Sequence, residues 1–479
     1  MQLLESQEPH FRGLKWVEED YGPEPRWTVE PDTGAIKQTL LSLRPSSTVE
    51  VTFLAQGAFN KIYNVSIDDE PFIMRVSLPV DPQYKVMSEV ATMDWVRRVT
   101  SLPIPRIITY QSSRDNLVGF EWMLMTKMPG KPFGEILQSL PFAVKARLVK
   151  ELAASSASLF RNQLRGIGNI YGEPSVVEDS ESSVQIPTHR ELVDTEKLVL
   201  AKDPGSNDGS APVNQTSGGP LFNLPEKGSS VGALPDVGRI VSMQFFWDSH
   251  IHQNVHRGPF RSSKDWMIAR LSFNENDCRS ALKKHSDGDL DSDAEDEVDV
   301  ATRTLKIIDG LKSLLPLIFP TDDDDSELSM IFHNDLSRHN ILVDDSGELT
   351  GVLDWECVSA VPLWKACSYP SFLEGRPRHS EPVLGTYEPD DNGLPNEMYF
   401  EHLWQYETTL LRDVFIDEMR RLDTGWVEVF EKSELKRDFD YAVNYCDSWV
   451  SARDIEAWIR DITTNVSNPQ SLIDRVWAP

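Results

Sequence analysis

The chain has 479 residues, of which 40% are hydrophobic, and a formal net charge of −29 from 76 acidic and 47 basic side chains. This length is enough for two or three ordinary domains with substantial cores. The excess of acid argues against a protein that binds nucleic acid or an anionic membrane, because both need basic surfaces. It is compatible with a soluble protein that acts on a cationic molecule.

Four strands and a helix are predicted in the first quarter of the chain. Val51–Leu54, Lys61–Ile67 and Pro71–Leu78 are β-prone runs, and the second alternates apolar and polar residues. Tyr84–Val99 places apolar residues on one face at helical spacing. Val118–Met125 is a further apolar strand. Together these elements predict a small sheet with a helix inserted between its third and fourth predicted strands.

A tight tip joins the first two strands. It consists of five residues: Gln56, Gly57, Ala58, Phe59 and Asn60. Gly57 can allow the backbone to approach a phosphate group closely. An ordinary hairpin turn explains the same residues equally well.

Two later segments have the composition of linkers. Residues 172–234 are rich in Ser, Pro, Gly, Asp and Asn, so they cannot bury enough apolar surface and predict a flexible insertion. Residues 284–300 are acidic and predict a solvated linker, because they lack the turn glycine and closing Glu of a calcium loop. Between the two, aromatic residues over 238–271 indicate ordered structure, in which Arg257 is expected to be a buried structural residue.

The second half is predicted to be mainly helical. Ala301–Leu317 is an apolar-periodic helix, and residues 396–476 have mostly helical periodicity with recurring aromatic residues, which we interpret as core. Between these two regions, Ile341–Val343 and Leu349–Leu353 read as two short strands joined by a turn. That hairpin would bring the residue after it, Asp354, back beside Asn340.

The chemistry-bearing residues lie around this hairpin. Asp335 is followed five residues later by Asn340, and Asp354 comes directly after the second strand. Phosphoryl transfer from a metal-bound nucleotide needs one acid for the proton of the attacking hydroxyl, and an Asn and an Asp to hold magnesium. Magnesium rarely takes more than one or two carboxylates from the protein. The pattern therefore predicts a phosphotransferase site; a polar turn before a buried hairpin is the alternative.

These motifs resemble those of the aminoglycoside phosphotransferase and choline kinase group, including its fungal members. The His-x-Asp-x-x-x-x-Asn pattern stands at His333, Asp335 and Asn340, and the metal-binding Asp is followed by Trp355 and Glu356. The resemblance covers roughly residues 50–375 apart from the insertions. It implies an α+β, bilobal, protein-kinase-like fold. After an N-terminal extension (1–48), residues 49–128 would form an antiparallel nucleotide-binding N-lobe of five strands, and residues 129–479 a large, mainly helical C-lobe.

The resemblance also implies roles in the C-lobe. Asp335 would be the catalytic base, and Asn340 and Asp354 would bind Mg²⁺. Glu356 would reach a second metal ion or a cationic group of the substrate. His333 is expected to brace the loop rather than to take part in the chemistry.

Further roles follow for the N-lobe. The tip at 56–60 would cover ATP, Arg75 would contact its phosphates, and Glu89 would hold Arg75 in place. Thr126, Lys127 and Met128 would form the hinge that reads the adenine. Arg75 departs from the lysine of protein kinases, and the tip carries only one glycine. The simpler alternatives are a surface ion pair for Arg75 and Glu89, and a strand that ends at a turn for residues 126–128.

The expected function is ATP-dependent transfer of the γ-phosphate to a hydroxyl of an unidentified small molecule. The alternative is a pseudokinase, or interaction module, that keeps the fold without catalysis; Arg75 and the glycine-poor tip favour it. A protein kinase is disfavoured, because the chain has Asp354-Trp355-Glu356 in place of Asp-Phe-Gly and no Ala-Pro-Glu segment downstream.

The expected location is the cytoplasm. Four cysteines at scattered spacings form neither a zinc pattern nor a disulfide framework, which favours a reducing compartment. No run approaches the ~20 apolar residues of a membrane span. The N-terminus lacks the basic, apolar pattern of a signal or transit peptide.

Overall fold

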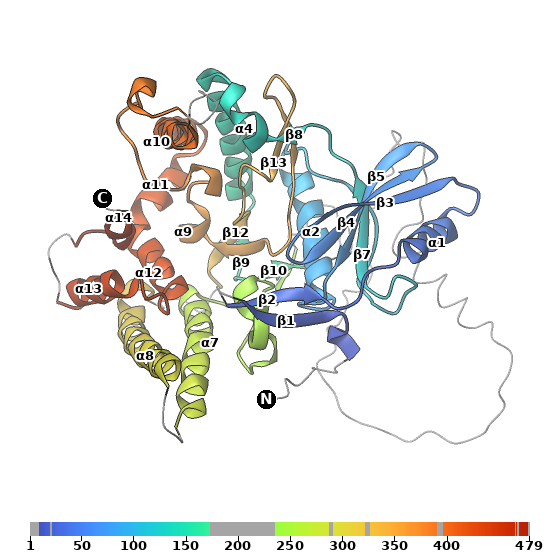
Figure 1. Ribbon diagram of the computed structural model, residues 1–479. Coiled ribbons are helices and arrows are strands. Elements are labelled where there is room, and N and C mark those ends of the chain that lie inside the picture. Colours follow the sequence, from blue (N-terminus) through green and yellow to red (C-terminus); the bar gives the residue numbers. More distant parts are fainter. Residues whose placement is uncertain are drawn as a thin grey trace, which may run out of the picture.

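The computed structural model describes residues 9–19, 22–172, 235–286, 291–320, 326–389, 396–464, 466 and 469–477. Within these ranges the chain forms two lobes, one built on an antiparallel sheet and a larger one that is mainly helical (Figure 1). The predicted bilobal α+β, kinase-like architecture is confirmed. None of the described helices is both long and apolar enough to cross a bilayer.

The N-lobe sheet has five antiparallel strands in the order β3-β4-β5-β7-β6. Their bounds are β3 Val49–Gln56, β4 Asn60–Ile67, β5 Glu70–Ser77, β7 Glu121–Thr126 and β6 Ile107–Gln111. Tyr63, Val65 and Ile67 are buried at alternate positions of β4, as a strand with one face on the core requires. The four predicted strands are confirmed, and β6 completes the sheet.

Helix α2 (Tyr84–Val99) has the bounds that the sequence predicts. Val86 and Val90 are fully buried against β6 and β7. Lys85 and Glu89, one turn apart, therefore lie on the same part of the helix, and both are buried as well. α2 thus carries two charged side chains into the interior.

The predicted N-terminal extension is folded from residue 9 onward. After η1 (Pro9–Phe11), β1 (Leu14–Glu19) and β2 (Gly22–Trp27) form an antiparallel hairpin, and α1 (Thr33–Leu43) follows. Asp32 caps α1 by accepting a hydrogen bond from the amide of Gly34. Ile36 and Leu40 are buried in the same apolar cluster as the inner face of β4.

The C-lobe contains the remaining described elements. In chain order they are β8 (Lys131–Pro132), α3 (Phe133–Ile136), η2 (Leu137–Ser139), α4 (Phe142–Arg161), β9 (Leu164–Arg165), β10 (Asn169–Ile170), β11 (Val237–Gly238), α6 (Met243–Phe246), η3 (Asp248–His252), α7 (Ser263–Lys284), α8 (Ser292–Ile318), β12 (Leu328–Phe332), β13 (Ile341–Val343), β14 (Leu349–Val352), β15 (Ser359–Pro362), α9 (Leu363–Ala366), η4 (Ser371–Leu373), η5 (Leu384–Thr386), α10 (Glu397–Leu422), α11 (Thr424–Lys432), α12 (Glu434–Asn444), α13 (Ala452–Thr463) and α14 (Leu472–Val476).

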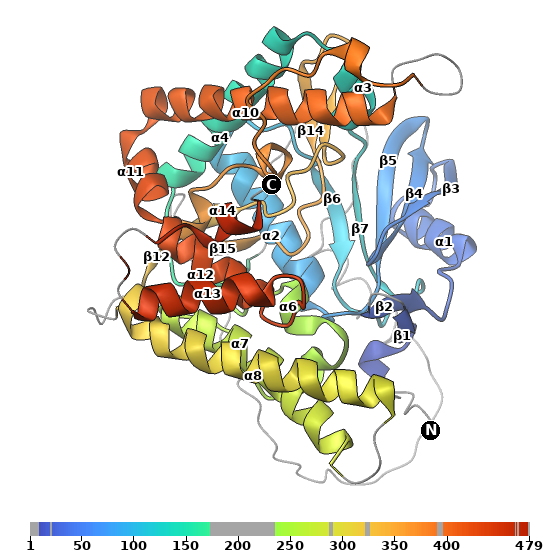
Figure 2. The same cartoon turned by 60° about the vertical axis from the view of Figure 1, so that its left-hand side comes forward.

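Two small sheets position the loops between the lobes. β12 pairs with β15 and β9, and the β13–β14 hairpin pairs with β8. α4 and α10 pack together on one side of these sheets, while α7, α8 and α13 lie together on another (Figure 2). The predicted hairpin and the helical C-terminal part are therefore confirmed.

The predicted acidic linker at 284–300 is wrong for its described second part. α8 begins at Ser292, and the Asp291 side chain accepts a hydrogen bond from the amide of Ala294. Asp293 and Glu295 fall in the first turn, where negative charge is favourable to the helix dipole. The acids thus start a helix rather than keep a linker extended. Of the predicted insertion at 172–234, only residue 172 lies inside the described ranges.

The region 238–271 is ordered as predicted, and Arg257 has the structural role expected of it. Its guanidinium donates hydrogen bonds to the main-chain oxygens of Phe245, His250 and Ile251. It therefore holds the turn between α6 and α7.

Candidate active site

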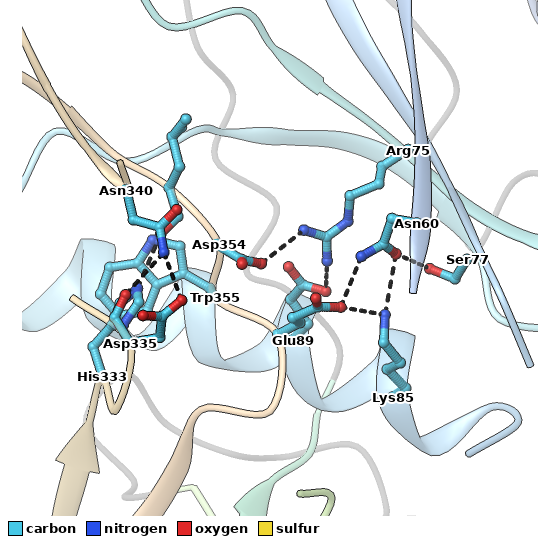
Figure 3. Close-up of polar contacts among 12 residues, drawn as sticks. Asn60, Arg75, Ser77, Lys85, Glu89, His333, Asp335, Asn340, Asp354 and Trp355 are labelled. Carbon is cyan, nitrogen blue, oxygen red and sulfur yellow. Dashed lines mark hydrogen bonds and ion pairs between the residues drawn. The ribbon is translucent and has the colours of Figure 1, made fainter. Parts of the chain in front are cut away.

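The loop after β12 brings Asp335 and Asn340 together. Asn340 Nδ2 donates to Oδ2 and to the main-chain oxygen of Asp335, each at 2.9 Å (Figure 3). Asp335 is exposed. Because the Asn340 nitrogen faces Asp335, its Oδ1 has no donor in the described part of the chain. An acid open to solvent thus lies beside an amide oxygen that can bind a cation.

Asp354 lies next to this pair, as the predicted hairpin requires. The amide of Leu353 donates to the main-chain oxygen of Asn340 at 2.8 Å. Figure 3 shows the Asp354 carboxylate between Arg75 and the Asp335–Asn340 pair. Asp354 has a φ of 60°, in the left-handed region that non-glycine residues seldom adopt. The fold therefore holds this carboxylate in a strained but defined position.

His333 braces the loop, as predicted. Its Nε2 lies 2.9 Å from the main-chain oxygen of Leu353, which can only accept, so Nε2 carries the proton. The ring also meets the buried Trp355 edge-on, with centroids 4.8 Å apart. Burial lowers the pKa of His333, which keeps the imidazole neutral. His333 thereby ties the loop after β12 to the loop that carries Asp354.

The predicted Arg75–Glu89 pair is present and buried. Arg75 comes from β5 and Glu89 from α2, and their side chains are 7% and 1% exposed. The other side of the guanidinium points to the C-lobe, where Arg75 Nη1 lies 3.7 Å from Asp354 Oδ1. Arg75 therefore connects the helix of one lobe to the metal-binding candidate of the other.

Lys85 is a functional candidate that the sequence reasoning missed. Its Nζ lies 2.6 Å from Glu356 Oε2 and 3.1 Å from Asn60 Oδ1. The available signal was its position four residues before Glu89, on the same part of the predicted helix. Its partner Glu356 is distant in sequence, so no local pattern indicated the contact.

The electrostatics of the site favour a bound cation. Four carboxylates gather here, those of Asp335, Asp354, Glu356 and Glu89, against the two cations Arg75 and Lys85. Burial, and then the charge of Glu356, raises the pKa of Asp354 to about 6. Burial alone would raise the pKa of Glu356, but the positive charges of Lys85 and Arg75 hold it at about 2.

The donor set also fits magnesium. Oxygens of Asp354 and Asn340, completed by water and phosphate, are ligands that this ion takes. No group of three or more His, Cys, Asp or Glu side chains arranged for a metal occurs among the described residues. Asn340 and Asp354 would hold the ion together with a nucleotide, rather than as a closed cage.

The predicted tip divides into exposed and buried halves. Gln56, Gly57 and Ala58 are exposed, and the amide of Gly57 donates to the main-chain oxygen of Asn60 at 2.9 Å. Phe59 is buried against Phe246 and Trp247, and Asn60 is buried in the contacts with Lys85 and Glu356. A nucleotide would therefore meet residues 56–58, while 59 and 60 anchor the tip.

The predicted hinge follows β7 and lies against the C-lobe hairpin. Thr126 Oγ1 accepts a hydrogen bond from the amide of Arg106 at 2.9 Å, and Lys127 Nζ donates to Asn64 Oδ1 at 2.9 Å. Met128 packs over Gly351 of β14, where an added Cβ would come within 3.3 Å of the Met128 side chain. These three residues thus lead from the N-lobe sheet toward the C-lobe hairpin; their reading of adenine stays a prediction.

Similarity to curated proteins is limited to part of the chain. The chain is similar to a subtelomeric hrmA-associated cluster protein of Aspergillus fumigatus, at 28% identity over 147 residues, or 30% of this chain and 28% of that protein. It is also similar to altered inheritance of mitochondria protein 9, mitochondrial, of Saccharomyces cerevisiae, at 23% identity over 168 residues, or 32% of this chain and 27% of that protein. The chain thus matches little more than a quarter of the length of these curated relatives.

The comparison with solved structures has aminoglycoside phosphotransferases among its matches. One is the GDP and kanamycin complex of APH(2")-IIia, with a TM-score of 0.37 and 13% identity, covering 90% of this chain and 99% of that one. Another is a thermostable mutant of APH(4)-Ia in ternary complex with ADP and hygromycin B, with a TM-score of 0.39 and 12% identity, covering 89% and 98%.

The family assignment comes from the sequence match across both lobes. Residues 50–364 match the model of the phosphotransferase enzyme family, APH. The matched range runs from β3 of the N-lobe past the loop with Asp335 and Asn340, and past Asp354, to α9. It covers well over half of the chain, which therefore belongs to the phosphotransferase enzyme family.

Proposed function

We propose that the protein transfers the γ-phosphoryl group of ATP to a hydroxyl of a small molecule. The observation that carries the proposal is the meeting of Asp335, Asn340 and Asp354 at the junction of the lobes, with Arg75 reaching Asp354 from the N-lobe. Kinase-like phosphoryl transfer depends on this combination of a proton acceptor, metal ligands and a phosphate-binding cation.

Each residue has a separate task. Asp335 accepts the proton of the attacking hydroxyl and orients it, and the hydrogen bond from Asn340 fixes the Asp335 carboxylate. Asn340 Oδ1 and Asp354 would hold magnesium, which neutralises charge on the phosphates when bound. Arg75 contacts phosphate oxygens, and Glu89 keeps its guanidinium aimed at them.

The remaining predicted residues would bind the nucleotide. Gln56, Gly57 and Ala58 cover the phosphates, and the backbone from Thr126 to Met128 reads the adenine edge. We propose ATP and Mg²⁺ as cofactors on this basis. The acceptor hydroxyl and a cytoplasmic location stay predictions.

The alternative is an interaction module with the same fold. Arg75 in place of the kinase lysine favours it, because guanidinium and ammonium groups differ in shape and hydration. The two proposals differ in whether ATP and magnesium bind together and whether phosphate is then transferred.

Binding and transfer can be tested separately. Calorimetric titration with ATP should show binding that requires Mg²⁺, and Asp354→Asn should weaken or abolish that Mg²⁺-dependent binding. Asp335→Asn should retain Mg²⁺-dependent binding but lose transfer to a panel of hydroxyl metabolites by roughly 10²–10⁴-fold. The matched control is Asp345→Asn, an exposed acid at the β13–β14 turn that pairs with Lys131 at 3.0 Å. Absence of any metal-dependent ATP binding would favour the interaction module.

A further inference from the structure

Lys85 is a buried cation placed where the two lobes meet. Its side chain is 2% exposed, and it comes from α2, whereas its partner Glu356 follows the metal-binding candidate in the C-lobe. A buried ammonium is costly unless it is paired and hydrogen-bonded. The contact with Glu356 Oε2, at 2.6 Å, is therefore a requirement of the fold rather than an incidental surface pair.

Asn60 completes this arrangement and fixes its geometry. Its Oδ1 accepts hydrogen bonds from Ser77 Oγ at 3.0 Å and from Lys85, while its Nδ2 donates to Glu356 Oε2 at 2.8 Å (Figure 3). The amide has only this orientation, because reversing it would place its NH₂ group against the Lys85 ammonium and its oxygen against the Glu356 carboxylate. Lys85 and Asn60 thus both donate to one oxygen of Glu356, which restricts rotation of the carboxylate.

We propose that Lys85 takes the place of a second metal ion. Its ammonium neutralises and positions Glu356, so that the nucleotide site works with one magnesium ion, held by Asn340 and Asp354. This inference rests on the proposed function and deepens it. Lys85 is a positioning residue in this account, since it acts through Glu356.

The physical reason is the cost of the alternative. If Glu356 turned to bind a second ion, the Lys85 ammonium would lose the one carboxylate that it contacts directly among the described residues, while remaining buried. A second divalent ion beside that ammonium would also be repelled by it. The ammonium group belongs to the chain itself, so this half of the site does not depend on the concentration of free magnesium.

The number of bound ions tests the proposal. Mn²⁺ is counted by electron paramagnetic resonance on the full chain with a non-hydrolysable ATP analogue, with protein in slight excess so that all analogue is bound. We expect one Mn²⁺ per bound nucleotide for the unchanged protein and two for Lys85→Met, in which Glu356 is released. The double variant Lys85→Met/Glu356→Gln should return to one.

A closely matched control exists in the C-lobe. Lys145 of α4 pairs with Glu407 of α10 at 2.6 Å, and the two side chains are 4% and 15% exposed, compared with 2% and 15% for Lys85 and Glu356. Lys145→Met removes an equally buried charge away from the nucleotide site and should leave the count at one. It separates general destabilisation from release of Glu356.

The possible outcomes distinguish the two proposals. Two ions in the unchanged protein would overturn the role of Lys85 but leave the phosphotransferase proposal standing, as would a count of one in a folded Lys85→Met variant. No Mn²⁺ and no analogue bound to the unchanged protein would overturn the proposed function itself. If Lys85→Met does not fold, the count in the unchanged protein still decides, and Glu356→Gln alone should not lower it.

Discussion

The buried pair of Arg75 and Glu89 should hold α2 against the sheet. Glu89→Gln removes the charge of a side chain that is 1% exposed and leaves an arginine that is 7% exposed. Breaking a buried ion pair by removing one partner costs about 3–5 kcal/mol. Arg75 keeps Asp354 at 3.7 Å, so we expect the lower end, about 3 kcal/mol.

Amide hydrogen exchange of α2 measures this directly. At about 1.4 kcal/mol per tenfold, a loss of about 3 kcal/mol accelerates exchange of the α2 amides roughly 150-fold, if exchange is limited by local opening. Asp94→Asn is the control on the same helix: Asp94 pairs with Arg98 at 3.0 Å, and that arginine is 47% exposed. Such a pair contributes about 0.5 kcal/mol, or roughly a twofold change. Equal, small accelerations in both variants would refute the argument that burial makes the Arg75–Glu89 pair strong.

Three further predictions concern protons and backbone space. The pKa of Asp354 is raised to about 6, so below that pH a metal ion must displace a proton to bind. The affinity for Mn²⁺ should therefore fall about tenfold per pH unit below pH 6. Equal affinities at pH 5 and pH 7, measured by calorimetry, would contradict this. Although burial opposes it, the charges of Lys365 and Arg270 lower the pKa of Asp440 to about 2 from 3.8. The folded pKa lies below the unfolded one, so about 2 kcal/mol of stability should be present above pH 4 and be lost as the pH falls toward 2. In denaturation curves, Asp440→Asn should remove this acid-dependent contribution to the free energy of unfolding. An unchanged acid dependence in the variant would contradict the prediction. Gly130 has a φ of +99°, and an added Cβ would lie 2.7 Å from the main-chain oxygen of Val343, whereas an added Cβ at Gly57 meets nothing within 4 Å. Gly130→Ala should therefore lower the melting temperature and Gly57→Ala should not. Equal melting temperatures would show that the turn at Gly130 tolerates a side chain.

Local patterns in the sequence predicted the parts of the site that lie close together in the chain. Asp335 and Asn340 lie on one loop, and a short hairpin, whose register could be predicted from its apolar residues, separates them from Asp354. Arg75 and Glu89 were predicted from the resemblance to the phosphotransferase group, on a strand and a helix that follow one another in the chain. The structure shows the contact between these two neighbouring elements.

Contacts between distant segments could not be predicted in the same way. Lys85 meets Glu356 only because the N-lobe docks on the C-lobe. The pattern of apolar and polar residues within either segment does not indicate which distant residue it will contact. Phe59 looked like part of an exposed tip, but Phe246 and Trp247 cover it from a segment far along the chain. The acidic run at 291–295 was predicted to be a linker because of its charge. A cap and the helix dipole make the same charges favourable at the start of α8.

In the proposed reaction the carboxylate of Asp335 takes the proton of an acceptor hydroxyl beside a metal held by Asn340 and Asp354. The most direct test of this step is the formation of labelled product from γ-labelled ATP and a metabolite panel, comparing the unchanged protein with Asp335→Asn. We predict a labelled metabolite whose rate of formation falls by roughly 10²–10⁴-fold in the variant, with ATP binding retained. An unchanged rate in Asp335→Asn would contradict the account.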